Sequence, residues 1–291
     1  HLDLEEPTVH LFFQNIRSER VKKSKFNIFI NTKKVSINDR SFLYGDGLFE
    51  TILVRDGKIY YLKDHYSRLK KGSKLLKILI PDFKSTESSI KKCINKTKNC
   101  IVKIIISRGD NKFGYQIPSG IVPNIYINKI RLPKYINNSL KLGLSNYKFS
   151  QNNTLSSIKH NNRIEQSLIA NQLSLSRKYD DLVVLDYKNN IVETLSSNIF
   201  FVKNSKNLVI YTPDLLNAGI HGIMRSNIIS YLRNKKIKII QKKIPIDTAD
   251  KYDFCFICNS IRGIRFVESI NKKKYSISNV LYNILKDFIY E

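Results

Sequence analysis

The sequence lacks a run of about 18 consecutive apolar residues, the length that a membrane-spanning helix requires. Its start also lacks a charged segment followed by an apolar stretch, so we expect no secretory signal peptide. Only four cysteines occur among 291 residues, which suits a reducing compartment better than a disulfide framework. We therefore predict a cytoplasmic protein that has no membrane partner.

Metal-binding motifs are absent as well. The five histidines form no H-E-x-x-H motif, and no second cysteine pair accompanies Cys255 and Cys258. Those two cysteines lie in the apolar stretch DFCFICNS, which has no turn residues that could fold it around a metal. We therefore predict a buried strand there and no metal site.

Acidic residues are scarce, with 24 against 50 lysines and arginines, and the formal net charge is +26. Such a charge would suit nucleic acid. The lysines, however, are spread along the whole chain among many isoleucines and asparagines, as an AT-biased coding sequence would produce. No aromatic RNA-binding motif, zinc-finger spacing or clustered basic helix is present. We predict no nucleic-acid partner.

The strand and helix patterns predict an α+β protein of two domains. Residues 1–24 form an N-terminal extension of unknown role, because they do not lead smoothly into a strand. A small domain is expected over 25–133, a polar linker over 134–139 and a large domain over 140–291. In the small domain we expect hairpins over 26–39 and 49–62, helices over 64–79 and 86–97, and strands over 101–107 and 121–130.

In the large domain a helix is expected from about Asn162, with Glu165 completing an N-cap pair. The strands 181–186, 198–202 and 208–212 are predicted to form a meander. The remaining predictions are a strand at 140–145, a helix at 222–233, strands at 237–241 and 253–259, and a helix after Ser278.

Three features could carry chemistry. Lys159 lies just before the helix at Asn162, where the positive helix end would lower the pKa of its amine, as suits a nucleophile or a Schiff-base lysine. Gly219 and Gly222 precede another helix, whose free N–H groups could bind phosphate. Glu193 is a carboxylate that could hold a pyridine nitrogen protonated. These are the parts that a pyridoxal 5'-phosphate site needs.

Several stretches carry a family resemblance in their order and spacing: DRSFLYGDGLFET, HYSRLKKG, ISRG followed by GY, IKHNNRIEQSLI, VVLD, IVETLSSNIFFV, TPDLLNAGIHGIMR and ICNS. From about residue 26 to its end, the chain resembles the fold-type IV pyridoxal phosphate enzymes, also called class IV aminotransferases. The resemblance implies a two-domain fold like that of D-amino acid aminotransferase, with a small N-terminal α/β domain and a larger C-terminal pseudo-barrel domain.

The resemblance also implies roles for individual residues. Lys159 would form the Schiff base with pyridoxal 5'-phosphate and act as general acid and base, and Glu193 would pair with the pyridine nitrogen. Arg68, Ser260 and the backbone amides of Ile223 and Met224 would bind the cofactor phosphate; relatives often have threonine at the position of Met224. The substrate pocket would contain Tyr44, Phe49, His160, Arg163 and Asn259.

The implied activity is a carbon–oxygen lyase reaction that converts 4-amino-4-deoxychorismate to 4-aminobenzoate and pyruvate in folate biosynthesis. Phe113 stands where the family commonly has arginine, so the basic residues that bind the substrate carboxylates stay open. Family members are homodimers, and we expect one here. The alternatives are a class IV aminotransferase for branched-chain or D-amino acids, and a basic nucleic-acid-binding protein on a degenerate enzyme scaffold.

Overall fold

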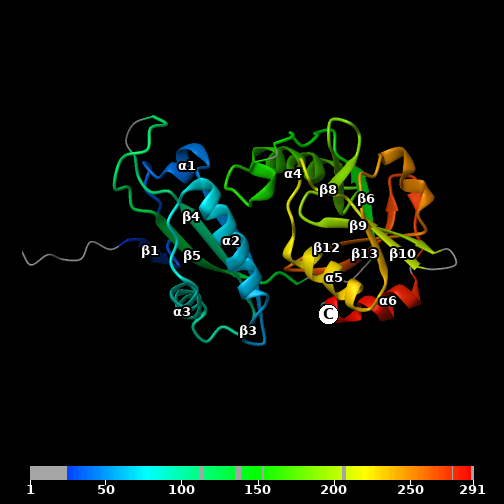
Figure 1. Ribbon diagram of the computed structural model, residues 1–291, viewed down its shortest axis with the longest axis horizontal. Coiled ribbons are helices and arrows are strands. Elements are labelled where there is room, and N and C mark those ends of the chain that lie inside the picture. The colour runs from blue at the N-terminus through cyan, green and yellow to red at the C-terminus, as the bar shows by residue number, and fades with distance from the viewer. Residues whose placement is uncertain are drawn as a thin grey trace, which may run out of the picture.

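The computed structural model describes residues 25–111, 114–134, 139–152, 154–204, 208–276 and 278–289. The expected extension 1–24, Phe113 and most of the expected linker lie outside these residues. The described chain forms two curled sheets that lie side by side, each with helices packed against it (Figure 1). This two-part α+β arrangement agrees with the fold class predicted from the sequence.

The first sheet has five strands in the order β1-β5-β4-β2-β3. They are β1 (Asn27–Ile30), β2 (Gly47–Arg55), β3 (Lys58–Ile59), β4 (Cys100–Ser107) and β5 (Asn124–Arg131). The helices of this part are α1 (Arg40–Tyr44), α2 (Leu62–Leu76) and α3 (Phe83–Ile94). Apolar residues of α2 and α3, such as Leu69 and Ile90, share one core with Ile52 and Val102 of the sheet. Their burial holds both helices on one face of the sheet (Figure 1).

One of the two predicted hairpins is confirmed and one is wrong. Residues Asp56 and Gly57 turn between β2 and β3 with positive φ angles of 51° and 76°. In contrast, β1 has no hairpin partner and pairs in parallel with β5. The chain leaves β1 at Asn31, whose side-chain amide donates a hydrogen bond to Cys93 O and accepts one from Lys129 N. These distant contacts, which local sequence cannot reveal, replace the expected hairpin.

The second sheet runs in the order β11-β10-β9-β12-β13-β6-β7-β8, and β14 pairs with β13. Its strands are β6 (Leu140–Leu144), β7 (Asp181–Leu185), β8 (Ile191–Thr194), β9 (Asn198–Asn204), β10 (Leu208–Thr212), β11 (Lys238–Gln241), β12 (Phe254–Asn259), β13 (Gly263–Ile270) and β14 (Lys273–Lys274). The helical segments are η1 (Leu155–Ser157), α4 (Ile164–Ser176), α5 (Ile223–Asn234), η2 (Ile246–Lys251), α6 (Asn279–Leu285) and η3 (Lys286–Phe288).

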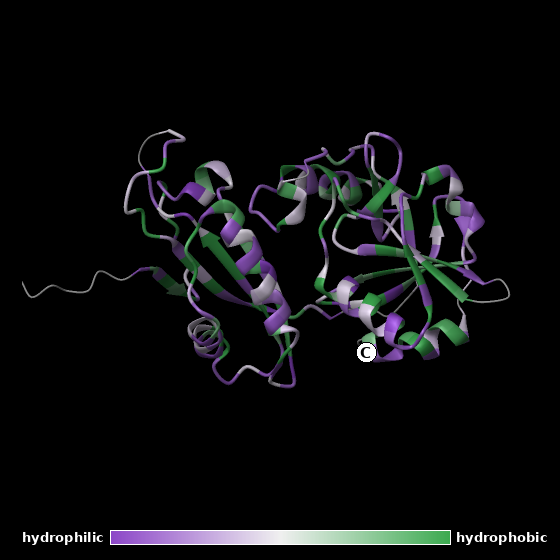
Figure 2. Ribbon diagram, in the orientation of Figure 1, coloured by the Kyte–Doolittle hydropathy of each residue, from purple (hydrophilic) through white to green (hydrophobic). Residues whose placement is uncertain are grey.

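Hydrophobic strands form the centre of both sheets, and the surrounding helices and loops carry most of the hydrophilic residues (Figure 2). In the second sheet, β12 is the clearest case, since Cys255, Phe256, Ile257 and Cys258 are all buried. The C-x-x-C pair is therefore part of a buried strand, as predicted. Among the described residues no group of histidine, cysteine and carboxylate side chains could hold a metal, and no helix is both long and apolar enough to cross a membrane.

The predicted meander is only partly correct. Strands β9 and β10 pair antiparallel, but β12, β13 and β6 separate β9 from β7. The predicted cap of α4 is also wrong: Arg163 occupies the N-cap position without a capping side-chain bond. The Glu165 carboxylate instead accepts hydrogen bonds from the backbone N and the hydroxyl of Ser150. It thus anchors the loop before Lys159 rather than the start of the helix.

Candidate active site

The loop that carries Lys159 belongs to the second half of the chain but pairs with a strand of the first sheet. The backbone N–H of Phe49 donates to Lys159 O at 3.0 Å, and the N–H of Asn161 donates to Gly47 O at 2.9 Å. Leu48 and His160 form the bridge between these two bonds. Strand β2 therefore fixes the position of Lys159.

The two glycines of YGDG make this pairing possible. A Cβ atom on Gly47 would lie 2.1 Å from Ile106 O and 2.5 Å from the side-chain nitrogen of Asn161. Gly45 has a φ of +67°, and a Cβ there would lie 2.9 Å from that of Asn162. The glycines thus serve close packing of the lysine loop.

The Lys159 side chain lies over the Phe49 ring, with Nζ 4.3 Å from the ring centroid. Burial, followed by the nearby Arg68, lowers the pKa of Lys159 from 10.5 to about 8. Glu50 and Glu193 act in the opposite direction but do not cancel this effect. Sequence reasoning attributed the lower pKa to the helix end, whereas α4 begins only at Ile164, and burial is the principal cause.

Glu193 lies on β8 and is only 6% exposed, so it is no solvent-facing strand residue. Its Oε2 accepts hydrogen bonds from Ile220 N and from Asn198 Nδ2, each at 3.1 Å. Burial raises the pKa of Glu193 to about 7, although the Ile220 N–H and Arg163 favour the ionised form. The carboxyl group is therefore poised to share a proton with a basic partner at neutral pH.

A cavity of about 350 Å³ contains both groups. The start of α5 also lines this cavity. Gly222 is the N-cap of α5 and has no side chain, so the N–H groups of the first turn have no capping side chain. A Cβ atom on Gly222 would lie 2.0 Å from Asn198 Oδ1, which shows how closely the backbone packs here. Arg68 reaches this helix start from α2, and its Nη1 donates to His221 O at 3.1 Å.

Most of the predicted site residues line this one cavity: Phe49, Arg68, Lys159, Arg163, Glu193, Ile223, Met224, Asn259 and Ser260. Tyr44 does not line it. Tyr44 ends α1 and packs against the Tyr115 ring at 5.2 Å, with the Arg40 guanidinium 5.1 Å from its own ring centroid. The Asn259 side chain is occupied within the fold, because its Oδ1 accepts from the backbone of Ile261 and Arg262.

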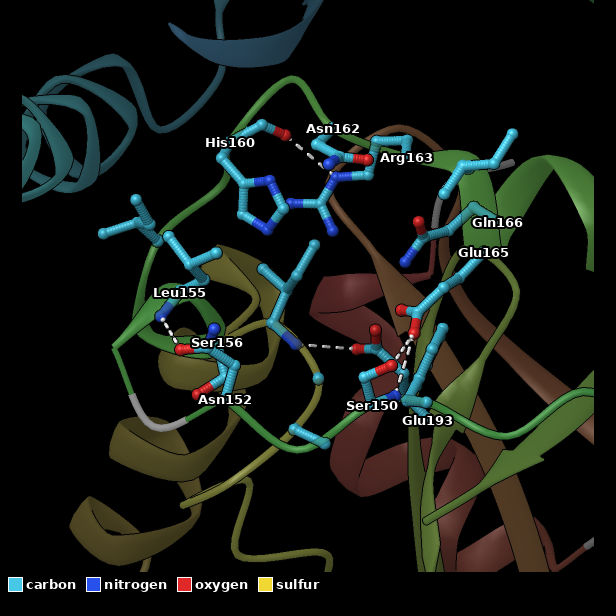
Figure 3. Close-up of a pocket in the computed structure, with 16 residues that line it drawn as sticks. Ser150, Asn152, Leu155, Ser156, His160, Asn162, Arg163, Glu165, Gln166 and Glu193 are labelled. Atoms are coloured by element: carbon cyan, nitrogen blue, oxygen red, sulfur yellow. Dashed lines mark hydrogen bonds between the residues drawn. The ribbon is translucent and has the colours of Figure 1, made fainter. Parts of the chain in front are cut away.

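His160 lines a second cavity of about 280 Å³, which shares Arg163, Gln166, Glu193 and Ile220 with the first. In Figure 3, His160 and Arg163 lie on one side of this cavity and Glu193 lies across from them. Burial, then Arg163, lowers the pKa of His160 to about 4, so its ring is neutral at neutral pH. The buried Nη2 of Arg163 has no hydrogen-bond partner among the described residues.

Sequence reasoning missed two residues that shape the cavity. Glu50 forms two hydrogen bonds with Arg68, and Asn198 bonds Glu193 and Ile220 O. Glu50 stands beside Phe49 in the sequence, and Asn198 stands five residues after Glu193. A search for the partners of the predicted arginine and glutamate could have considered both.

The donor set fits pyridoxal 5'-phosphate. Lys159 supplies an amine with a lowered pKa, Glu193 a buried acid, and Arg68 with the start of α5 a phosphate site of the kind that helix N-termini form.

The sequence matches the family Amino-transferase class IV over residues 47–270. It is 30% identical over 248 residues to an aminodeoxychorismate lyase of Vibrio harveyi, covering 84% of this chain and 90% of that protein. A putative branched-chain-amino-acid aminotransferase of Methanocaldococcus jannaschii is 26% identical over 268 residues, with coverages of 87% and 91%. The crystal structure of 4-amino-4-deoxychorismate lyase from Pseudomonas aeruginosa is similar with a TM-score of 0.79 and 25% identity, covering 88% of this chain and 94% of that one. The chain therefore belongs to the class IV amino-transferase family, whose enzymes depend on pyridoxal 5'-phosphate.

Proposed function

We propose that the protein is a pyridoxal phosphate-dependent lyase that converts 4-amino-4-deoxychorismate to 4-aminobenzoate and pyruvate. The observation that carries the proposal is the shared cavity of Lys159 and Glu193, in which Arg163 presents a buried guanidinium nitrogen without a partner. Similarity to the lyases of Vibrio harveyi and Pseudomonas aeruginosa supports the choice of reaction.

The described residues can hold the cofactor at three points. Lys159 would bind it covalently, Glu193 would contact the ring nitrogen, and Arg68 with the backbone of Ile223 and Met224 would bind the phosphate. Ser260 lines the same cavity. When bound, pyridoxal 5'-phosphate supplies an electron sink that stabilises a carbanion on the substrate.

Lys159 is the proposed general base and acid. Its lowered pKa of about 8 leaves part of the population as free amine near neutral pH, and Nζ can then remove the proton from the ring carbon that bears the substrate amine. The carbon–oxygen bond to the enolpyruvyl group breaks as the ring becomes aromatic. The Lys159 ammonium returns its proton to the methylene carbon of the departing enolpyruvate, which gives pyruvate.

Glu193 is proposed to hold a proton at the ring nitrogen of the cofactor. Two hydrogen bonds to Oε2, from Ile220 N and Asn198 Nδ2, fix its orientation. Because the site is buried, water does not compete for the carboxylate, and its interaction with a cationic ring is strong.

Arg163 is proposed to bind one of the two carboxylates of the substrate. Its Nε donates to His160 O at 3.0 Å, which holds the guanidinium in place while Nη2 stays unpaired. An arginine offers a planar pair of donors that matches a carboxylate. This residue thus provides an answer to the question raised by Phe113, which lies outside the described residues.

The test is to incubate purified protein with pyridoxal 5'-phosphate and freshly generated 4-amino-4-deoxychorismate, and to measure both products. Equal amounts of 4-aminobenzoate and pyruvate are expected from the wild type, and neither from Lys159→Ala. Lys148→Ala, at an exposed lysine in the same region, is the matched control and should keep full activity. Cofactor binding without either product would reject the lyase.

An aminotransferase for branched-chain or D-amino acids is the second candidate. The relative from Methanocaldococcus jannaschii favours it. The two activities would use the same lysine and differ in the fate of the carbanion. Transfer of an amino group from leucine or D-alanine to 2-oxoglutarate, without 4-aminobenzoate formation, would establish it.

The proposal also includes a homodimer, a cytoplasmic location and no nucleic-acid partner, as the family resemblance and the even spread of charge suggest. Light scattering of the purified protein should give twice the chain mass. DNA binding that falls steeply with salt concentration would instead support a role in nucleic-acid binding.

A further inference from the structure

Behind Arg68 lies a buried group of three side chains that the proposed reaction does not use directly. Glu50 on β2 is 1% exposed, and its two oxygens accept from Arg68 Nε and Nη2, each at 2.7 Å. His65 on α2 is also 1% exposed, and its Nδ1 lies 2.6 Å from Glu50 Oε2. Neither Glu50 nor His65 lines the cavity, whereas Arg68 does.

The five N–H groups of the Arg68 guanidinium therefore have different partners. Two point back to Glu50, and a third, on Nη1, binds His221 O at the entrance to α5. The two remaining N–H groups, one on Nη1 and one on Nη2, can donate hydrogen bonds to a ligand at the start of α5. A bidentate arginine–carboxylate pair fixes both the position and the plane of the guanidinium.

The charge state of Glu50 agrees with this role. Burial raises the pKa of Glu50, but Arg68 and His65 outweigh it and lower the value to about 2. The carboxylate therefore stays ionised across the working pH range and does not release Arg68.

We infer that Glu50, supported by His65, is a positioning residue that orients Arg68 toward a phosphate monoester at the N-terminus of α5. The inference rests on the proposed cofactor site and adds the group on which phosphate recognition depends. Arg68 would bind the phosphate, while Glu50 would act on the phosphate through Arg68.

Two effects of removing the carboxylate oppose each other. Glu50→Gln deletes a negative charge, which by itself strengthens anion binding. It also leaves only one acceptor oxygen for Arg68 Nε and Nη2, which together formed two charge-assisted bonds with Glu50. The plane of the guanidinium is then no longer fixed. The orientation effect should dominate, because the carboxylate lies behind the cation and outside the cavity.

The experiment compares the affinities of pyridoxal 5'-phosphate and of pyridoxal, which lacks the phosphate, in titrations of the cofactor-free protein. Glu50→Gln should weaken pyridoxal 5'-phosphate binding by about tenfold or more relative to pyridoxal binding, because any effect of the lost charge on Lys159 is common to both ligands. The matched control is Asp46→Asn, because Asp46 pairs with Arg108 through Nε at 2.7 Å and Nη2 at 3.0 Å but does not line the cavity. It should leave the affinity ratio of the two ligands unchanged.

A purely structural role would lower both affinities together, and tighter or unchanged pyridoxal 5'-phosphate binding would also overturn the inference. Should Glu50→Gln fail to fold, Glu50→Asp is tested in its place by the ratio of the affinities for pyridoxal 5'-phosphate and pyridoxal. Aspartate keeps the charge but withdraws the carboxylate by one carbon. Failure of the wild type to bind pyridoxal 5'-phosphate would reject the proposed function itself and is thereby distinguishable.

Discussion

Lys159 and Phe49 touch twice: the Lys159 Nζ lies 4.3 Å from the Phe49 ring centroid, and the Phe49 backbone N donates to Lys159 O at 3.0 Å. The first contact buries the amine and the second fixes its backbone. Phe49 lies on β2 of the first sheet and Lys159 in the loop before α4, so the environment of the proposed base depends on how both halves of the chain pack.

Cofactor capture should therefore depend on pH through Lys159. The neutral amine attacks the cofactor aldehyde, and burial lowers the pKa of Lys159 to about 8, so the capture rate of the cofactor-free protein should rise through about pH 8. The Phe49→Ala substitution admits water to the amine. The pH at which the capture rate rises should then move toward the ordinary pKa of lysine, 10.5. Stopped-flow absorbance over a pH series measures it. A wild-type capture rate that rises only near pH 10 would contradict the burial of the amine.

Glu193→Gln should slow the lyase reaction by about a hundredfold and yet stabilise the cofactor-free protein. The pKa of Glu193 is raised from 4.5 to about 7 on folding, so its stabilising protonated form is fully present below pH 4.5 and is lost as the pH rises through 7. At pH 8 the variant should be more stable by on the order of 3 kcal/mol. Urea unfolding at pH 5 and pH 8 measures the difference. Equal pH dependence in both proteins would refute this account.

Gly222→Ala should weaken pyridoxal 5'-phosphate binding by about tenfold and cost about 1–3 kcal/mol of stability. A Cβ atom there would meet Asn198 Oδ1 at 2.0 Å, and Asn198 holds Glu193. Gly57→Ala is the matched control: its Cβ meets nothing within 4 Å, although its φ of +76° adds strain. Cofactor titration and thermal unfolding of both variants separate a site effect from a general loss of stability.

Arg163→Met should raise the KM for 4-amino-4-deoxychorismate by about tenfold to a hundredfold, because one carboxylate loses a charged hydrogen bond. Arg163→Lys should show a smaller rise, since it keeps the charge but not the planar donors. Arg177→Met removes an exposed arginine at the end of α4 and should have no effect. Steady-state kinetics test this, and an unchanged KM for Arg163→Met would assign the carboxylate to another cation.

Local patterns predicted the elements that local contacts determine. The turn at Asp56 and Gly57 and the helices α2, α3 and α5 follow from turn residues and apolar spacing, and their ends lie within about three residues of the predictions. The parallel pairing of β1 with β5 and the position of β12 between β9 and β13 depend on contacts between residues far apart in the sequence. Periodicity within one segment carries no information about such partners.

The candidate site divides in the same way. Lys159, Glu193 and Arg68 were named from their motifs, and they line one cavity. Tyr44 was named from a motif as well; it packs on Tyr115 outside this cavity, and its place in the substrate pocket stays a prediction. Glu50 was missed because its role exists only through Arg68, 18 residues later on another element.

Among the lysines of the chain, Lys159 alone is proposed to bind the cofactor covalently. Borohydride reduction of the protein loaded with pyridoxal 5'-phosphate converts the carbon–nitrogen double bond between lysine and cofactor into a stable bond, and peptide mass spectrometry locates it. A single phosphopyridoxyl group on Lys159 is expected. Labelling at another lysine, or scattered over several, would contradict it.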